Sequence, residues 1–258
     1  KRALAVDIAC GSGQLTQTLS RPLNLDAKTG EEYGFGFQNV VGLDTSQSQL
    51  DKALEHCAAS NIEYRLEDIE HALSFDDDAA DLVTIAQGLH WFQIPRLLKE
   101  TKRILKREHG VFAVLGYSAP RFEQYEKFQE EFGKFYVQTL GSYDYGVHGR
   151  KCYWNIDRKL LDFAFEDETM FVGEGLFAEQ SFERAFFFEH HWWTEQQLFG
   201  YFQSMSGYRT YLTENGLEHG DDGDPMNHLR DVFRRDMKKY EQSKMLVIFP
   251  FFLLTMKK

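Results

Sequence analysis

The segment Ala5–Gln14, with the sequence AVDIACGSGQ, joins a run of apolar residues to a turn that contains two glycines. Residues 4–8 have the length and composition of a buried strand, and residues 14–19 are compatible with a helix. Glycines at such a turn let the backbone come close to a ligand, because no Cβ is in the way. The start of the next helix offers unpaired N–H groups and a positive partial charge. We therefore expect a nucleotide-like ligand at the end of a sheet.

Strands and helices alternate through the first half of the chain. After residues 4–8, further strands are predicted over residues 39–44, 62–66, 81–86 and 111–115, and the polar stretch 23–38 is predicted to be a loop. Ser46 is expected to cap a helix with Gln49 as its capping-box partner. Repeated strand–helix units predict an α/β fold with a parallel sheet that is covered by helices on both faces. Ligands of such sheets bind at the carboxyl ends of the strands.

The alternation stops after Tyr117, and this break suggests how the chain is organised. Residues 1–119 are predicted to be the first part of a Rossmann-like core, and the aromatic-rich residues 120–180 an inserted helical cap. Alternation returns afterwards, with a helix capped by Thr194 and a closing apolar strand, so residues 181–258 are predicted to complete the core. Because the chain opens directly on a strand, we expect further residues before Lys1.

Composition and charge narrow the choice of partners. The 258 residues carry a net charge of −11, which argues against a nucleic-acid partner, since such partners require a basic surface. Cys10, Cys57 and Cys152 show no metal-type spacing, and this usage favours a reduced, cytoplasmic compartment. The apolar segment 245–256 is too short to cross a bilayer, so it is expected to be a buried strand and no membrane association is predicted.

The turn itself discriminates between cofactors. Thr16 stands where a dinucleotide fingerprint requires a third glycine or alanine, and a Walker sequence is absent. Acidic residues stand at the ends of the first two predicted strands, Asp7 and Asp44, and directly after the third, Glu67–Asp68. A pyrophosphate would be repelled by the first of these carboxylates, whereas a cofactor with a cationic amino-acid end would be tolerated. Asp7 and Asp44 have structural alternatives, as a local turn cap and as an acid at a helix N-terminus.

Residues 6–13, VDIACGSG, resemble the glycine-rich first motif of the class I S-adenosylmethionine-dependent methyltransferases, with Ala9 in place of the usual first glycine. The segments 41–46 and 67–69 are similar to the motifs of that family that hold the ribose and the adenine. The resemblance implies a doubly wound, Rossmann-like, seven-stranded sheet, mostly parallel with the last strand antiparallel. It implies S-adenosylmethionine as cofactor and S-adenosylhomocysteine as product. The cofactor-binding residues it implies are Asp7, Ala9, Gly11, Gly13, Asp44, Thr45, Asp68, Ile69 and Gln87.

A narrower resemblance concerns residues 86–92, AQGLHWF, with residues 198–208 and 249–251. They are similar to the trans-aconitate methyltransferase-like branch, also called methyltransferase type 11. On this basis Trp91 is expected to line the acceptor pocket and His90 to contact cofactor or substrate, with a general-base role as its catalytic possibility. The alternative for both residues is local packing.

Other residues are candidates for the acceptor pocket. Tyr117, Trp154 and Tyr201 are predicted to line it, although core packing is the alternative for each of them. Arg209 is the candidate for pairing with a substrate carboxylate, because a guanidinium binds this group through two hydrogen bonds. Neighbouring residues of a strand point to opposite faces, so His190 and His191 cannot hold one ion, and no metal site is predicted.

The sequence thus predicts methyl transfer to an oxygen or nitrogen nucleophile of a small molecule, with a carboxylate among the candidate acceptors. Two other hypotheses stay open at this stage. The chain could be a regulatory or partner-subunit module that retains the cofactor fold without catalysis. An NAD-dependent oxidoreductase is disfavoured by the missing third glycine. The oligomeric state is not predicted.

Overall fold

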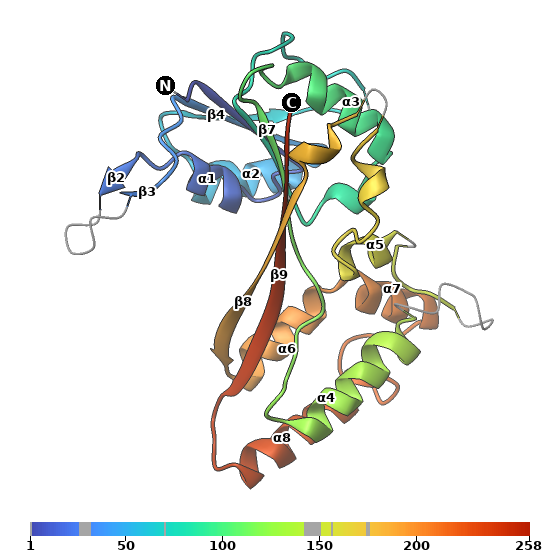
Figure 1. Cartoon of the computed structure of the whole chain (residues 1–258). Coiled ribbons are helices and arrows are strands. Elements are labelled where there is room, and N and C mark those ends of the chain that lie inside the picture. Colours follow the sequence, from blue (N-terminus) through green and yellow to red (C-terminus); the bar gives the residue numbers. More distant parts are fainter. Residues whose placement is uncertain (1, 26–31, 70, 142–150, 156, 174–175) are drawn as a thin grey trace. The chain divides into compact units, whose positions relative to one another are not determined.

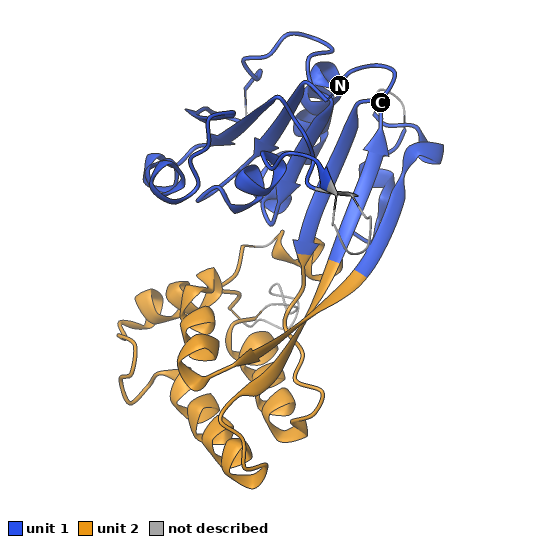
Figure 2. Cartoon of the chain, turned by 90° about the vertical axis from the view of Figure 1, so that its left-hand side faces the viewer, with its two compact units in different colours: residues 1–116, 165–186, 252–258 blue, residues 117–164, 187–251 orange. Residues whose placement is uncertain are grey.

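The computed structural model describes residues 2–25, 32–69, 71–141, 151–155, 157–173 and 176–258 (Figure 1). The chain divides into two compact units. Unit 1 comprises residues 1–116, 165–186 and 252–258, and unit 2 comprises residues 117–164 and 187–251 (Figure 2).

A seven-stranded sheet has the strand order β5-β4-β1-β6-β7-β9-β8. Its strands are β1 (Leu4–Ile8), β4 (Asn39–Asp44), β5 (Ile62–Leu66), β6 (Leu82–Ala86), β7 (Val111–Tyr117), β8 (Glu183–Trp193) and β9 (Met245–Lys257). The first five strands pair in parallel, and the last, β9, is antiparallel. This arrangement confirms the predicted fold class, including the direction of the last strand.

Helices cover both faces of the parallel strands, as right-handed crossovers require. Helices α1 (Gln14–Leu19) and α2 (Gln47–His56) pack on β1, β4 and β5. Helix α3 (Ile94–Ile104) lies on the opposite face of the sheet (Figure 1). It buries Leu97, Leu98 and Ile104 on one side and has Pro95 in its first turn, where a missing N–H costs nothing.

Two local predictions need correction or refinement. The Ser46 side chain does not cap α2, and Gln49 does not complete a capping box; the Ser46 hydroxyl lies 3.1 Å from that of Ser48. The stretch predicted as a loop over residues 23–38 contains the two-residue strands β2 (Asn24–Leu25) and β3 (Glu32–Tyr33), which pair antiparallel. Residues 26–31 lie outside the described residues.

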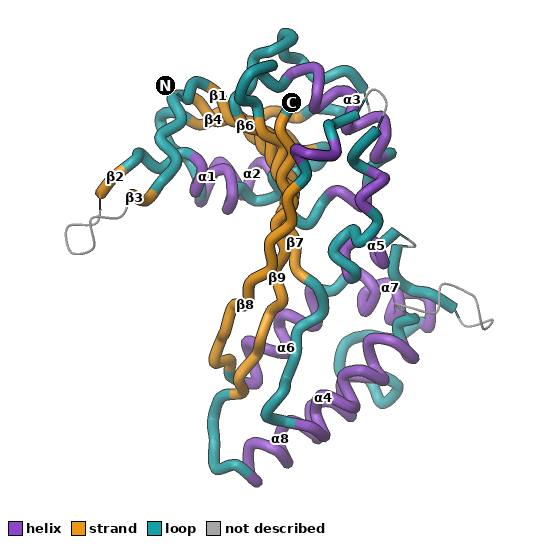
Figure 3. The backbone as a smooth tube through the Cα atoms, viewed as in Figure 1, coloured by secondary structure: helices purple, strands orange, loops and turns teal. Residues whose placement is uncertain are grey.

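Unit 2 is largely helical (Figure 3). Its helices are α4 (Glu126–Gly133), α5 (Arg158–Asp162), α6 (Glu195–Ser204), α7 (Ser206–Asn215) and α8 (Pro225–Lys239), and a π-helical turn, Lys134–Thr139, follows α4. Thr194 caps α6 in a capping box with Gln197, as the Thr194 prediction required. Phe122, Phe132 and Phe202 meet in the core of unit 2, with ring centroids 5.1 Å apart for Phe122–Phe132 and for Phe132–Phe202.

The two units divide the chain at other residues than the three segments predicted from sequence. Residues 181–258, predicted as core completion, are shared between both units. Strands β8 and β9 have 11 and 13 residues, about twice the length of an ordinary strand, so each contributes to both units. The predicted cap shares residues 120–164 with unit 2.

Two glycines of unit 2 make a matched test of its packing. A Cβ on Gly207 would lie 2.5 Å from the Trp154 ring, whereas a Cβ on Gly200 would meet nothing within 4 Å. We expect Gly207→Ala to destabilise the protein by about 1–3 kcal/mol, because the buried Trp154 ring must move. Gly200→Ala, within α6, should stabilise it by up to about 1 kcal/mol. Urea unfolding of both variants checks this; equal effects of the two would contradict the close packing of Trp154.

Candidate functional site

The turn after β1 holds three residues in the left-handed backbone region. Ala9, Gly11 and Gly13 have φ values of 54°, 55° and 86°. The Cys10 amide donates to Leu43 O at 2.9 Å, and the Gly13 amide to Cys10 O at 3.0 Å. Ala9 thus takes the conformation that favours glycine, at the position where the resembling family usually has one.

The two glycines of the turn have different surroundings. A Cβ on Gly11 would meet nothing within 4 Å, so open space lies beside this part of the backbone. A Cβ on Gly13 would collide with the Tyr64 hydroxyl, so Gly13 permits close packing between α1 and β5. Of the two, Gly11 is therefore the glycine that a ligand could approach.

Asp44, at the end of β4, ties the turn to the neighbouring strand. Its Oδ2 accepts a hydrogen bond from the Gly11 amide at 2.8 Å, and its Oδ1 accepts one from the Ser46 amide at 2.8 Å. The Asp44 carboxylate therefore binds the amide of Ser46, the residue just before α2. It also remains partly exposed, so it can receive hydrogen bonds from a ligand.

Asp7 is fully buried in the middle of the sheet. Its two oxygens accept hydrogen bonds from the hydroxyls of Thr16 and Thr84, both at 2.7 Å. Burial raises the pKa of Asp7 from 3.8 to about 6, despite the two hydroxyl donors, which lower it. As it lies, Asp7 has no exposed surface for a ligand, and its direct contact with a cofactor stays a prediction.

Thr16 is a residue whose role the sequence alone did not indicate. In the sequence, Thr16 served only to show that the third glycine of a dinucleotide fingerprint is missing. In the structure, its hydroxyl joins α1 to β1 through a hydrogen bond to Asp7. The sequence offered one signal: Asp7 lies in an apolar strand, and hydroxyl residues stand nine positions later, at Thr16, and in another predicted strand, at Thr84.

The remaining residues predicted for the cofactor lie at the carboxyl ends of β4, β5 and β6. Thr45 and Asp68 are exposed, whereas Ile69 is buried. Asp68 Oδ2 lies 2.7 Å from His71 Nδ1. Gln87, directly after β6, has a φ of 57°, and its amide donates to Leu115 O at 2.9 Å. Left-handed non-glycine residues thus follow two adjacent strands, β1 and β6, and such strain is typical of functional sites.

His90 and Trp91 form a short 3₁₀ turn, Leu89–Trp91, in unit 1. The His90 side chain is buried, and its ring centroid lies 5.0 Å from that of Trp91. Trp91 is 56% exposed, which is unusual for so large an aromatic side chain. Its exposure is compatible with the predicted contact to an acceptor, and the roles of both residues stay predictions.

Three of the residues predicted for the acceptor pocket come together in unit 2. Tyr117 and Tyr201 both pack on Phe249, with ring centroids 5.4 and 5.3 Å away, and the two tyrosines interact electrostatically. Trp154 joins this group through Arg158, whose guanidinium lies 5.1 Å from the Trp154 ring. Arg158 was not singled out from the sequence, because it lies in a stretch without clear periodicity.

Arg209 lies apart from these interactions. It is exposed on α7, and its Nε donates to Gln203 O at 3.1 Å. On β8, Trp192 is half exposed, while His191 and Trp193 stack on each other with centroids 5.6 Å apart. His191 and Trp193 also pack on Phe249. Among the described residues, no three His, Cys, Asp or Glu side chains are grouped so that they could hold a metal ion.

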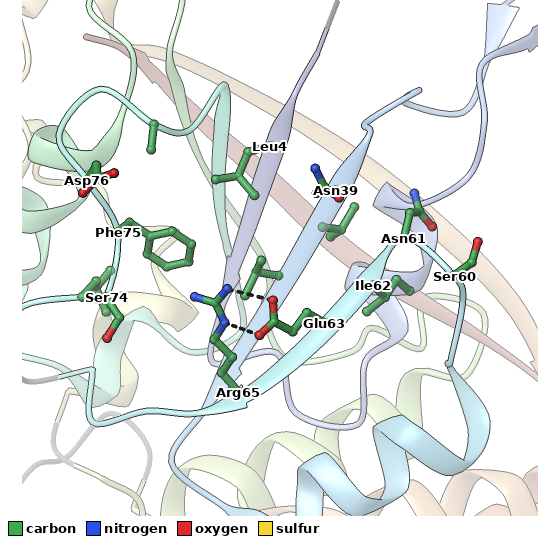
Figure 4. A pocket seen from close by; sticks show the side chains of 14 residues that line it. Leu4, Asn39, Ser60, Asn61, Ile62, Glu63, Arg65, Ser74, Phe75 and Asp76 are labelled. Carbon is green, nitrogen blue, oxygen red and sulfur yellow. Dashed lines mark hydrogen bonds and ion pairs between the residues drawn. The ribbon is translucent and has the colours of Figure 1, made fainter.

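Two hollows of unit 1 contain none of the predicted site residues. One, of about 690 Å³, is lined by the first residues of β1 and β4 together with β5 and residues 73–79 (Figure 4). In it, Arg65 forms two hydrogen bonds with Glu63, at 2.7 and 2.8 Å, and lies over Phe75. The other, of about 930 Å³, lies around Phe35, Phe37 and Asp81. The structure also contains no helix long and apolar enough to cross a membrane, within the described parts of the chain.

The raised pKa of Asp7 predicts a pH-dependent stability. In the folded protein Asp7 has a pKa of about 6, whereas in the unfolded chain its pKa is about 3.8. Protonated Asp7 therefore adds most to the free energy of unfolding at low pH, and this stabilisation is lost as the pH rises through 6. Replacing Asp7 with Asn should remove this dependence. Between pH 4 and pH 7, the unfolding free energy of Asp7→Asn relative to the wild type should rise by up to about 3 kcal/mol.

Urea titrations at several pH values measure this difference. Asp51→Asn, an exposed position on α2, serves as the control and should show no comparable trend. A relative stability of Asp7→Asn that does not change with pH would contradict the burial of an ionisable Asp7.

The left-handed conformation of Ala9 predicts a stabilising substitution. Ala9→Gly relieves a backbone strain of about 1–2 kcal/mol and costs about 0.5–1 kcal/mol in chain entropy. The net gain should be about 0.5–1 kcal/mol in thermal or urea unfolding. Ala53→Gly, in the interior of α2, should instead destabilise the protein by about 1 kcal/mol or more. A loss of stability in Ala9→Gly would contradict the predicted relief of backbone strain at this residue.

The chain is similar to known methyltransferases. Residues 6–114 match the family described as methyltransferase domain. A Dictyostelium discoideum protein classed as a methyltransferase is 27% identical over 260 residues, which is 100% of this chain and 83% of that protein. A demethylmenaquinone methyltransferase of Lactobacillus johnsonii is 30% identical over 158 residues, 56% of this chain and 59% of that protein.

A solved structure shares the fold over nearly the whole chain. It is a protein of Anaeromyxobacter dehalogenans classed as a type II methyltransferase, with a TM-score of 0.70 and 19% identity, covering 98% of this chain and 89% of that one. These matches do not distinguish the trans-aconitate methyltransferase-like branch, which stays a prediction. The sheet order and the turn after β1 agree with these matches: residues 6–114 match a methyltransferase domain, and the fold is that of the class I methyltransferases.

Proposed function

We propose that unit 1 binds S-adenosylmethionine at the carboxyl ends of β1, β4, β5 and β6, and that the protein transfers the methyl group to an oxygen or nitrogen of a small molecule. The observation that carries this proposal is the hydrogen bond from the Gly11 amide to Asp44. It holds the turn beside open space and places a carboxylate next to it. A small polar ligand with hydroxyl groups fits such a surface.

The donor and acceptor groups at this edge suit the parts of the cofactor. In this proposal the partly exposed Asp44 accepts hydrogen bonds from the ribose hydroxyls, and Thr45 lies beside it. Asp68 accepts from the adenine amine, and the buried Ile69 supports the ring. Gly11 gives the backbone access, while Ala9, Gly13 and Gln87 shape the surface. Asp7 acts as a positioning residue, since Thr16 and Thr84 occupy both of its oxygens.

The chemistry requires little from the protein beyond positioning. When bound, the cofactor supplies a methyl group whose bond to a positively charged sulfur breaks as a lone pair of the acceptor forms the new bond. The protein then has to orient the acceptor and exclude water. A carboxylate acceptor is already ionised at neutral pH and needs no general base. The exposed Trp91 and the buried His90 are proposed to contact the acceptor rather than to remove a proton from it.

The acceptor is proposed to be a small molecule with apolar character. The acidic composition disfavours nucleic acid, and the aromatic groups of unit 2 suit an apolar or amphipathic metabolite. A cytoplasmic location fits three cysteines that form no disulfide.

Asp44 gives the direct test of the cofactor site. We expect Asp44→Ala to weaken S-adenosylmethionine binding at least about tenfold, because both a ligand contact and the hydrogen bond to Gly11 are lost. Asp44→Asn should lie between Asp44→Ala and the wild type. Asp51→Ala, on the exposed side of α2, should bind as the wild type does. Isothermal titration calorimetry of the four proteins measures the dissociation constants.

Different outcomes separate the hypotheses. No binding of S-adenosylmethionine by the wild-type protein, or equal binding by Asp44→Ala, would rule out the proposed site. Binding without release of S-adenosylhomocysteine over a panel of carboxylic acids, phenols and amines would favour the non-catalytic regulatory module instead.

A further inference from the structure

Unit 2 contains a group of polar aromatic side chains around one arginine. We call it the Arg158 cluster and define it by Tyr117, Tyr136, Trp154, Arg158, Asp162 and Tyr201. Tyr117 ends β7, Tyr136 lies in the π-helical turn after α4, Arg158 and Asp162 begin and end α5, and Tyr201 lies on α6. Residues from four separate segments thus converge, and π-helical turns are frequent at functional sites.

Asp162 fixes Arg158 through one side of its guanidinium. Nε of Arg158 donates to Asp162 Oδ1 at 3.1 Å, and the Tyr136 hydroxyl donates to the same carboxylate at 3.0 and 3.3 Å. Ser118 Oγ donates to the Asp162 carbonyl at 2.9 Å. The Asp162 side chain is fully buried and that of Arg158 is 16% exposed. Among the described residues, no acceptor receives a hydrogen bond from either Nη group of Arg158.

The surroundings of Arg158 supply further donors. The ring of Trp154 lies 5.1 Å from the guanidinium, and its buried Nε1 has no hydrogen-bond partner among the described residues. Tyr201 is close enough to Arg158 for the two to interact electrostatically, and it carries a hydroxyl. Asp162 is already engaged with Nε and with Tyr136. The cluster therefore has unused N–H groups and lacks a matching acceptor.

Unused donors in a mostly buried place call for a ligand that only accepts hydrogen bonds. A carboxylate meets this need, because its two oxygens match the two Nη groups of a guanidinium end-on. The aromatic rings of Trp154 and Tyr201 would contact the apolar part of the same molecule. A phosphate dianion fits less well, because the fully buried Asp162 already places a negative charge beside the guanidinium.

We propose that the Arg158 cluster is a site within unit 2 that binds the carboxylate of an aromatic or similarly apolar carboxylic acid, with Arg158 as the specificity-determining residue. This inference goes beyond the proposed methyl transfer. Arg209, which the sequence suggested for a carboxylate, is exposed and donates a hydrogen bond to Gln203 O.

Phenylacetate serves as the probe, and phenylacetamide, which has the same shape without the charge, serves as its control. The indole N–H signal of Trp154 is followed by NMR in the full chain and assigned with Trp154→Phe. We expect a saturable shift with phenylacetate and binding at least about tenfold weaker with phenylacetamide. Arg158→Met and Arg158→Lys should each lose about tenfold in phenylacetate affinity, whereas Arg209→Met should bind as the wild type does.

Arg158→Lys protects the test against misfolding. It keeps a positive charge beside the buried Asp162 but lacks the two-nitrogen fork, so it should fold even if Arg158→Met does not. The indole signals of Trp91, Trp192 and Trp193 report whether each variant retains the native structure.

Three results would overturn the inference: no saturable shift at tens of millimolar phenylacetate, equal binding of the amide, or unchanged affinity in folded Arg158→Lys. Titrating S-adenosylmethionine into the same samples separates the two proposals. Loss of cofactor binding by the wild type would sink the proposed function while leaving a carboxylate site intact. Normal cofactor binding, together with phenylacetate binding that does not depend on Arg158, would overturn only the proposed carboxylate site.

Discussion

The Asp44 carboxylate bridges two strands of the sheet, and the proposed site depends on this bridge. Its Oδ2 holds the Gly11 amide and its Oδ1 holds the Ser46 amide. One side chain therefore holds both the turn after β1 and the residue just before α2. Loss of the carboxylate leaves two amides without their acceptor and frees the turn, so the geometry of the turn and the proposed binding of the ribose both depend on Asp44.

A second set of hydrogen bonds, made by Asp7, holds β1 in place before the turn. Asp7 joins β1 to α1 through Thr16 and to β6 through Thr84. The turn is thereby anchored on both sides, to β4 through Asp44 and to β6 through Asp7. The strained backbone at Ala9 and Gln87 persists at the ends of β1 and β6 because these anchors determine where each strand stops.

The sequence predicted the sheet well because its signals are local. Continuous apolar runs such as residues 4–8 and 39–44 are stable only as buried strands. The residues that form the turns after them are close in sequence, so they can be recognised locally. The capping of α2 was predicted wrongly because Ser46 and Gln49 match a capping box, whereas a carboxylate two residues earlier competes for the same amide. Periodicity identifies a segment as a strand but does not show which other segments it packs against. It therefore could not show that β8 and β9 each belong to both units.

The grouping of aromatic residues in unit 2 was predictable only in part, because it depends on contacts between distant segments. Tyr117, Trp154 and Tyr201 were singled out by type and come together in unit 2. Arg209 was singled out because a guanidinium can pair with a substrate carboxylate, and Arg158 was not singled out. In the structure, Arg158 lies beside the Trp154 ring and is held by the buried Asp162. Burial of a charged side chain is a tertiary property, and no local pattern around Arg158 signals it.

Backbone amide NMR of the protein titrated with S-adenosylmethionine tests the central claim most directly. Binding at the turn should shift the amide signals of Gly11, Ser12, Asp44 and Thr45 most strongly, with those of Asp68 and Ile69 next. Shifts centred instead on the hollow around Arg65 and Phe75, or no shifts at saturating cofactor, would contradict the account.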